Sequence, residues 1–407
     1  MEQRVVITGV GIVSPVGIGK EAFWQALKEG RSGIARITAF DPREYSCQIA
    51  GEVKGFNPLI YMEEKEARRM GRATQFGVAA AKMALEDAGL TNWRDDGRRL
   101  GLSLGFTTQV LDKFEEQFCH FKEKGSPKFI DPHTLSMIRV HTPASTIAQL
   151  FKIEALSSTL ANDCAGGLMA IGEAFRLIRD RKLDLALSGG ISSTITPYAF
   201  SLFCAAGILT KQNTHPEKAS RPFDRKRDGV VYSEGAAFVV LERLDDARLR
   251  KAPIYGEVLA IEKANRTGIR QGEGWADTIR QTLERARVLP PEIDYISTHA
   301  PSHPLLDLNE TLGIKQAFGP QAYNIPVSAI KSMIGNPGLA SGPSQVIASL
   351  LSLREGIIPP TINYEYPDPQ CDLDYVPNHY RINRVDRVLV LSGGMGGSEA
   401  CAVIQKV

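Results

Sequence analysis

The sequence predicts an α/β protein built from two similar halves, in which most strands are buried. Short runs of β-branched and other apolar residues alternate with helical patterns along the whole chain, and this alternation is typical of helices layered on a sheet. A second round of strand and helix begins near Pro253. We therefore expect two halves, at residues 1–250 and 251–407.

Strands of the first half are predicted from short apolar runs bounded by glycine. "RVVITGVGIV" opens the chain as a β-branched run with glycines near its end, and "LALSGGI" and "AAFVVLE" are further buried strands. Helical spacing is found in "ATQFGVAAAKMALEDAG" and "TPASTIAQLF". These patterns predict strands at 4–13, 185–191 and 236–242, and helices at 73–89 and 142–151.

The second half repeats the same kinds of element. "IYGEVLAIEKA" predicts a strand at 254–264, "WADTIRQTLERAR" a helix at 275–287, and "IDYISTHA" a strand at 293–300. "RVLVLSGGMGG" at 387–397 closes the chain in the style in which it opened. Both glycine-ended runs are expected to be central strands.

Composition and charge narrow the classes of function. The 407 residues include 48 basic and 46 acidic side chains, and the net charge of +2 provides no field that would attract nucleic acid or a membrane surface. No run approaches the roughly 20 apolar residues that cross a bilayer. The six cysteines lack the close pairs of metal sites. We expect a cytoplasmic protein with reduced thiols and no metal or cofactor, whose ligand binds in a pocket.

The segment "LANDCAGGLMAIGEAFR" places Cys164 before a helix. Apolar residues Leu168, Ile171 and Phe175 share one helical face, and small residues fill the first turn. Unpaired N–H groups and the helix dipole at such a position favour a thiolate, and small neighbours would leave room for a thioester carbonyl. A buried apolar thiol is the alternative. The segment alone leaves both interpretations open.

Two later segments supply further polar candidates. "STHAPSHPLLDLNE" places His299 at a strand end, with Asp307 and Glu310 at the start of the next helix, and "AIKSMIGNPGLASG" places Lys331 and Asn336 in a glycine-rich turn. Each has an ordinary alternative when taken singly: a core histidine, a solvated lysine, or an asparagine that tolerates positive φ. Together they match what carbon–carbon bond formation from a thioester needs, since a thiolate accepts an acyl group while N–H donors hold an enolate.

With these segments the sequence resembles the β-ketoacyl-acyl carrier protein synthase family of the thiolase-like superfamily over almost its whole length. The following blocks occur in the family's order: "VVITGVGIVSPVG", "RRMGRATQFGVAAAKMALEDAGL", "DCAGG", "GILT", "RPFDRKRDGVVYSEGAAFVVLE", "KSMIGNPGLASG", "PPTINYEYPDPQCDLDYVP" and "GGMGG". The resemblance implies a thiolase-like fold, in which two βαβαβ halves form five layers, α-β-α-β-α.

The resemblance also implies roles for individual residues. It matches Cys164 to the acylated cysteine, His299 to the first active-site histidine, Lys331 to the lysine of the KSxxGH block and Asn336 to the place of that block's second histidine. Asp307 and Glu310 match acidic residues that follow the first histidine. The residues implied to contact substrate are Phe203, Gly393, Gly394 and Met395.

Several positions depart from the family pattern. Asn336 stands where elongating synthases carry histidine, although a Cys-His-Asn set serves initiating and plant-type synthases. "HAPSH" replaces HGTxT, and in "GGMGG" Gly393 replaces a phenylalanine that gates the acyl channel. These loops resemble chain-length factors, the non-condensing partners of type II polyketide synthases, but those partners usually have glutamine in place of the cysteine.

The function implied is decarboxylative condensation of a Cys164-bound acyl group with a malonyl-type thioester, in a fatty acid or type II polyketide pathway. Two alternatives stay open: a chain-length-factor-like subunit of a heterodimer, and a malonyl-carrier decarboxylase. The implied partners are an acyl carrier protein with phosphopantetheine-bound acyl and malonyl groups, and a second ketosynthase subunit, identical or related.

Overall fold

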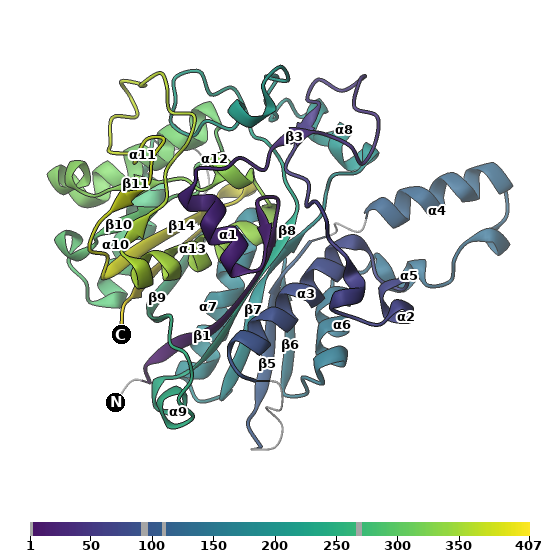
Figure 1. Ribbon diagram of the computed structural model, residues 1–407, viewed down its shortest axis with the longest axis horizontal. Helices are drawn as coiled ribbons and strands as arrows, with labels where there is room; N and C mark the ends of the chain where they lie inside the picture. The colour runs from purple at the N-terminus through teal and green to yellow at the C-terminus, as the bar shows by residue number, and fades with distance from the viewer. Residues whose placement is uncertain (1–2, 91–96, 108–110, 266–270) are drawn as a thin grey trace.

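The structure is a computed structural model that describes residues 3–90, 97–107, 111–265 and 271–407 (Figure 1). Its centre is one 11-stranded sheet to which both halves of the chain contribute. The first half provides six of these strands: five in the order β6-β5-β7-β8-β1, and the two-residue strand β2 (Gly17–Ile18), which pairs with β1. Their bounds are Val5–Ser14 (β1), Leu100–Gly105 (β5), Leu156–Leu160 (β6), Leu185–Ser192 (β7) and Gly235–Arg243 (β8).

The second half repeats this strand order. Its strands are Gly256–Asn265 (β9), Tyr295–Ser297 (β10), Val327–Ser328 (β11), Arg387–Gly393 (β14) and Ser398–Gln405 (β15). They lie in the order β11-β10-β14-β15-β9. When the five main strands of each half are numbered by their order along the chain, both halves place them in the sheet as third, second, fourth, fifth and first. A short antiparallel pairing of β1 with β9 joins the halves, with Val5 opposite Val258. The expectation of two similar halves is thus met in the strand order, while the division at residue 250, between α9 (Leu244–Leu249) and β9, stays a prediction.

Helices form three layers around the two parts of the sheet. Helices α3 (Arg72–Asp87) and α6 (Thr142–Phe151) cover the outer face of the first part, and α10 (Glu273–Ala286) and α11 (Pro304–Phe318) cover the outer face of the second. Between the two parts lie α7 (Gly166–Arg179) and α13 (Ser341–Glu355). The arrangement is the α-β-α-β-α fold that the sequence predicts.

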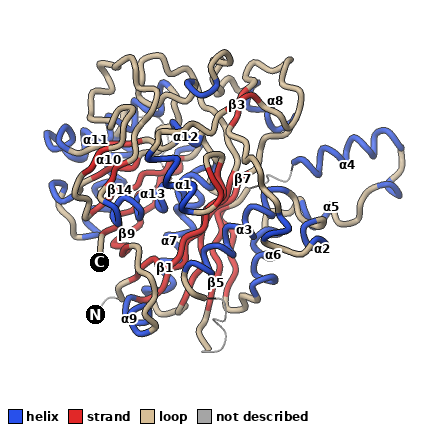
Figure 2. Tube along the Cα trace, viewed as in Figure 1, coloured by secondary structure: helices blue, strands red, loops and turns tan. Residues whose placement is uncertain are grey.

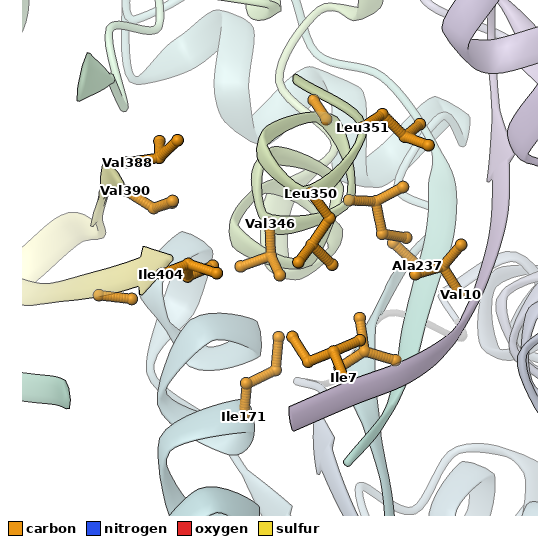
Figure 3. Packing of buried hydrophobic residues seen from close by; sticks show 14 of the residues in the cluster. Ile7, Val10, Ile171, Ala237, Val346, Leu350, Leu351, Val388, Val390 and Ile404 are labelled. Atoms are coloured by element: carbon orange, nitrogen blue, oxygen red, sulfur yellow. The ribbon is translucent and has the colours of Figure 1, made fainter. Parts of the chain in front are cut away.

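The core is centred on the buried helix α13. Its Val346 and Leu350 lie between Ile7 of β1 on one side and Val390 and Ile404 of β14 and β15 on the other (Figure 3). Side chains from both halves therefore share one apolar cluster, and burial of that cluster holds the two parts of the sheet at fixed positions.

Shorter elements lie at the edges of these layers. The remaining helices are α1 (Lys20–Lys28), α2 (Glu64–Ala67), α4 (Leu111–Lys124), α5 (Thr134–Met137), α8 (Pro197–Ala205), α9 (Leu244–Leu249) and α12 (Lys331–Ile334). The remaining strands are β2 (Gly17–Ile18), β3 (Ala35–Arg36), β4 (Ile49–Ala50), β12 (Ile357–Ile358) and β13 (Arg381–Ile382). Long loops gather at one end of the sheet, and α4 projects away from the body (Figure 2).

Most predicted elements are confirmed to within a few residues, but one strand is much shorter than expected. The run 293–300 forms only the three-residue strand β10. Its last residues leave the ladder because the Glu310 carboxylate accepts the backbone N–H groups of His299 and Ala300, each at 2.7 Å. A side chain of α11 thus replaces a neighbouring strand there. None of the described helices is long and apolar enough to span a membrane.

Candidate active site

Cys164 lies in a tight turn between β6 and α7. A 3-10 turn at Asp163–Ala165 leads directly into α7, whose apolar residues Leu168 and Ile171 are fully buried as the helical spacing predicts. The thiol is only 4% exposed and lines a cavity of about 350 Å³. The predicted position of the thiol at a helix N-terminus is confirmed.

The small residues after Cys164 have a different role from the one expected. A Cβ added at Gly167 would overlap the carbonyl oxygen of Leu339, and one added at Gly166 would lie 2.9 Å from the Leu339 side chain. Gly190 of β7 contacts the same Leu339 carbonyl. These glycines therefore leave room for the loop that follows Asn336, and the expectation that they make space for a thioester carbonyl is wrong.

Asn336 is held against the nucleophile by that loop. Its Nδ2 lies 3.5 Å from Cys164 Sγ, and its Oδ1 accepts a hydrogen bond of 2.9 Å from the Ser341 hydroxyl. Because a hydroxyl donates to Oδ1, the amide orientation is fixed with the N–H groups toward the sulfur. The alternative of a turn asparagine with positive φ does not hold, since it is Gly335 that has φ +70°.

His299 and Lys331 form a second buried pair in the same site. Lys331 Nζ lies 2.8 Å from His299 Nδ1, and both side chains are buried. Burial, with the neighbouring Lys331, lowers the pKa of His299 well below its usual range, and burial also lowers the pKa of Lys331. A neutral imidazole that accepts at Nδ1 carries its proton on Nε2. Lys331 is therefore not a solvated surface lysine, and His299 is not an isolated core histidine, as the alternative interpretations would have it.

Asp307 and Glu310 lie on one face of α11 beneath this pair. Asp307 accepts the N–H groups of Phe223 and His303, and burial raises its pKa to about 6 against the opposing effect of Arg227. Burial also raises the pKa of Glu310. Both carboxyl groups are turned toward backbone rather than toward the cavity, which suits positioning of the loops.

The electrostatic setting of the thiol differs from the expectation of a thiolate. Burial raises the pKa of Cys164 to about 12, and the adjacent Asp163 carboxylate adds to the rise, whereas Lys331 and Asn336 act in the opposite direction. Desolvation outweighs the favourable helix position. The free site therefore holds a neutral thiol that must lose its proton as the substrate reacts.

The glycine loop after β14 lies over the Cys164 turn. A Cβ at Gly394 would be 3.3 Å from the backbone nitrogen of Cys164, which brings the loop within reach of the nucleophile. The Met395 N–H donates to Asp163 Oδ2 at 2.8 Å, while the Met395 side chain is 63% exposed. A Cβ at Gly393 would lie 2.9 Å from the Trp275 ring. The structure thus brings Gly393, Gly394 and Met395 to the cavity wall.

Phe203 is the one predicted contact residue that does not line this cavity. It stacks on the Tyr232 ring with centroids 4.1 Å apart, and Tyr232 forms the wall in front of it. Sequence reasoning also missed other residues of the wall. They include Asp163, Tyr232, Trp275, His303, Asn309 and Glu399. Asp163 and Tyr232 lie inside matched motif blocks, and His303 lies in "HAPSH", so their place in or beside these blocks was the available signal.

Within the described ranges, no group of three or more His, Cys, Asp or Glu side chains is placed to hold a metal ion. The polar side chains gathered at the cavity are a thiol with an amide N–H against it and an imidazole whose Nδ1 contacts a lysine. Such a site can accept an acyl group on sulfur and hold a developing negative oxygen with two neutral donors.

The chain is similar to known proteins over its whole length. Residues 2–247 match the family description "Beta-ketoacyl synthase, N-terminal domain", and residues 257–365 match "Beta-ketoacyl synthase, C-terminal domain". The tetracenomycin polyketide synthase ketoacyl synthase alpha subunit of Streptomyces glaucescens is 38% identical over 100% of this chain and 97% of its own length. The 3-oxoacyl-acyl-carrier-protein synthase 2 of Synechocystis sp. is 37% identical over 100% and 98%.

Solved structures of ketosynthases are also similar to this chain over its whole length. The ishigamide ketosynthase/chain length factor superposes with a TM-score of 0.93 at 33% identity, over the whole of both chains. A type II polyketide synthase acyl carrier protein in complex with its ketosynthase, bound to the hexaketide, gives a TM-score of 0.92 at 30% identity, again over both chains.

Proposed function

Since the chain belongs to the β-ketoacyl synthase family, we propose that it is a β-ketoacyl-acyl carrier protein synthase of a fatty acid or type II polyketide pathway, an acyltransferase that performs decarboxylative condensation. The observation that carries this proposal is the pairing of Cys164 Sγ with Asn336 Nδ2 at 3.5 Å beside the His299–Lys331 pair, in one cavity. A cytoplasmic location belongs to the same proposal.

In the first half-reaction Cys164 takes the acyl group. Its sulfur attacks the carbonyl of a carrier-bound acyl thioester, the carbon–sulfur bond to the carrier breaks, and the thiol proton passes to the departing carrier thiolate. The backbone N–H of Cys164, at the second position of the turn Asp163–Ala165, would hold the oxyanion together with an N–H of the glycine loop. Met395 is the candidate in that loop, and its N–H is bonded to Asp163 in the free protein.

In the second half-reaction a malonyl-type thioester loses carbon dioxide. The electron pair of the breaking carbon–carbon bond becomes an enolate, whose oxygen would be held by His299 Nε2–H and Asn336 Nδ2–H. Lys331 keeps the imidazole in the required tautomer by donating to Nδ1. The enolate carbon then attacks the acyl group, and Cys164 leaves as a thiolate that recovers a proton.

A second subunit is part of the proposal because this chain has an exposed aromatic surface and an open strand edge. The arm around α4 exposes Phe114, Phe118 and Phe129, each between 44% and 55% exposed. Strand β6 pairs only with β5 and leaves its other edge unpaired among the described strands. Exposed aromatic patches and free strand edges are typical of protein interfaces.

One observation favours a second candidate, the non-condensing partner subunit of a heterodimer. The Asp163 carboxylate accepts a hydrogen bond from the Met395 N–H, and it also raises the pKa of the Cys164 thiol. Both effects oppose acylation. A subunit that shapes the acyl channel of a competent ketosynthase would tolerate such a contact. Retention of Cys164, His299 and Lys331 places this candidate second.

Intact-mass analysis of the purified protein separates the two candidates. The protein is incubated with acyl carrier thioesters, alone and with a related ketosynthase subunit, and Cys164→Ala is the control. The proposal expects an acyl adduct on Cys164 and release of carbon dioxide from malonyl thioester. An unmodified Cys164 in both incubations, with the adduct on the partner, would establish the second candidate.

A further inference from the structure

Tyr232 places a polar group in an otherwise apolar stretch of the cavity wall. Its neighbours in this stretch are Ile208 and Val230, and Val230 N–H donates to the Ile208 carbonyl at 2.9 Å, which keeps the segments together. Residues two apart in an extended chain point to the same side. Val230 and Tyr232 therefore face the cavity together.

The ring of Tyr232 is held close to the nucleophile. Backbone bonds join its segment to Asn336, whose N–H donates to the Val231 carbonyl at 2.8 Å and whose carbonyl accepts from Ser233 N–H at 3.0 Å. The ring stacks on Phe203 at an interplanar angle of 16°. Because Asn336 contacts Cys164, Tyr232 is one residue removed from the thiol on a rigid support.

The hydroxyl of Tyr232 is a donor without a partner in the described part of the chain. The residue is 6% exposed, and none of the described hydrogen bonds uses its hydroxyl. Burial raises the pKa of the phenol well above its usual range, and the nearby Cys164 and Asp163 act in the same direction. The group therefore stays protonated, and it can donate a hydrogen bond to an acceptor that enters the cavity.

We infer that the Tyr232 hydroxyl donates a hydrogen bond to an oxygen of the acyl chain bound to Cys164, so that the protein selects acyl groups oxygenated near the thioester over saturated groups of equal length. This inference rests on the proposed function. The wall of Ile208, Val230 and the Tyr232 ring suits a carbon chain, and the hydroxyl adds one polar contact to it. A carbonyl or hydroxyl oxygen of the acyl chain is the acceptor class that this donor can bind, and the third carbon is the position that we test.

The test compares two pantetheine thioesters of equal carbon number, acetoacetyl and butyryl. Initial rates of Cys164 acylation are measured by intact mass for the wild-type protein and for Tyr232→Phe, which keeps the ring and its stack on Phe203. Tyr45→Phe, which removes a hydroxyl from the neighbouring aromatic cluster outside the cavity, is the matched control. The acetoacetyl-to-butyryl rate ratio is compared between variants. The different intrinsic reactivities of the two thioesters cancel in this comparison because they are the same for every variant.

We expect Tyr232→Phe to lower the acetoacetyl-to-butyryl rate ratio about three- to tenfold, the range of one neutral hydrogen bond, mainly through the acetoacetyl rate. Tyr45→Phe should leave the ratio unchanged. Acylation of Cys164 with the same ratio in wild type and Tyr232→Phe would overturn this inference alone. Absence of any adduct on Cys164 from either thioester would overturn the proposed function, and this inference with it.

Discussion

Replacing Asp163 by glycine should speed the acylation of Cys164. The Asp163 carboxylate accepts the Met395 N–H at 2.8 Å, and that N–H is a candidate donor to the oxyanion of acyl transfer. Acylation that uses this donor must first break the contact. The same carboxylate raises the pKa of the nucleophile, so its removal acts in the same direction on the thiol.

The size of the effect follows from this contact. A hydrogen bond to a charged group contributes about 1.5–3 kcal/mol, and the lower end applies because Met395 is 63% exposed to competing water. At about 1.4 kcal/mol per tenfold change, release of the loop should raise the acylation rate about tenfold. Asp163 has φ +48°, a conformation that glycine adopts without strain, so the backbone should keep its place.

The assay is the initial rate of adduct formation on Cys164 from acetyl thioester, followed by intact mass. Asp163→Asn is the graded variant, because asparagine tolerates positive φ and can still accept from Met395 but carries no charge. We expect its rate to lie between those of wild type and Asp163→Gly. Asp180→Gly, at the far end of α7, controls for removal of an acidic side chain.

A slower rate in Asp163→Gly, with unchanged thermal stability, would refute this reasoning. It would show that the contact with Asp163 holds the loop in its working position. Equal acceleration in Asp163→Asn and Asp163→Gly would instead assign the whole effect to the charge beside the thiol, and the loop contact would have no part in the rate.

Three further changes separate the roles assigned to the site. His299→Ala should lower malonyl decarboxylation about 100- to 1,000-fold, as loss of an oxyanion donor does, while Cys164 is still acylated; loss of both activities in a folded variant would make His299 the activator of the thiol. Asn336→His should lower decarboxylation, because a larger ionisable ring replaces a fixed neutral amide, and a several-fold gain would contradict this. Gly393→Phe should slow acylation by long acyl groups more than by acetyl, because the new side chain displaces Trp275; equal slowing at every length would indicate general damage to the loop.

The fold could be predicted from the sequence because its signals are local. Apolar runs ended by glycine gave the strands, and helical spacing after Cys164 gave α7. The two similar halves and their five layers followed from the resemblance, whereas the order of the strands in each half is known only from the structure. The shortened strand β10 could not be predicted, because its end depends on Glu310, a side chain from the helix that follows it.

Part of the site could also be predicted from local signals. Cys164 and Lys331 stand out in the sequence because a reactive side chain lies there beside small residues and glycines. The balance of burial against helix position, which leaves Cys164 neutral, depends on how completely the surrounding loops exclude water. Tyr232 and Asp163 act only through distances to atoms far away in the chain, and those distances require the folded structure.

The contact of Leu339 with Gly167 and Gly190 has a consequence for how this scaffold can diversify. Because main-chain atoms of the two halves touch there, the spacing between the nucleophile turn and the Asn336 loop does not depend on which side chains occupy positions 164, 299 or 336. Those side chains can therefore be exchanged without a change in this spacing. A single methyl group at Gly167, by contrast, would overlap the Leu339 carbonyl and displace the Asn336 loop, so a glycine with no chemistry of its own constrains the site more tightly than the reactive side chains do.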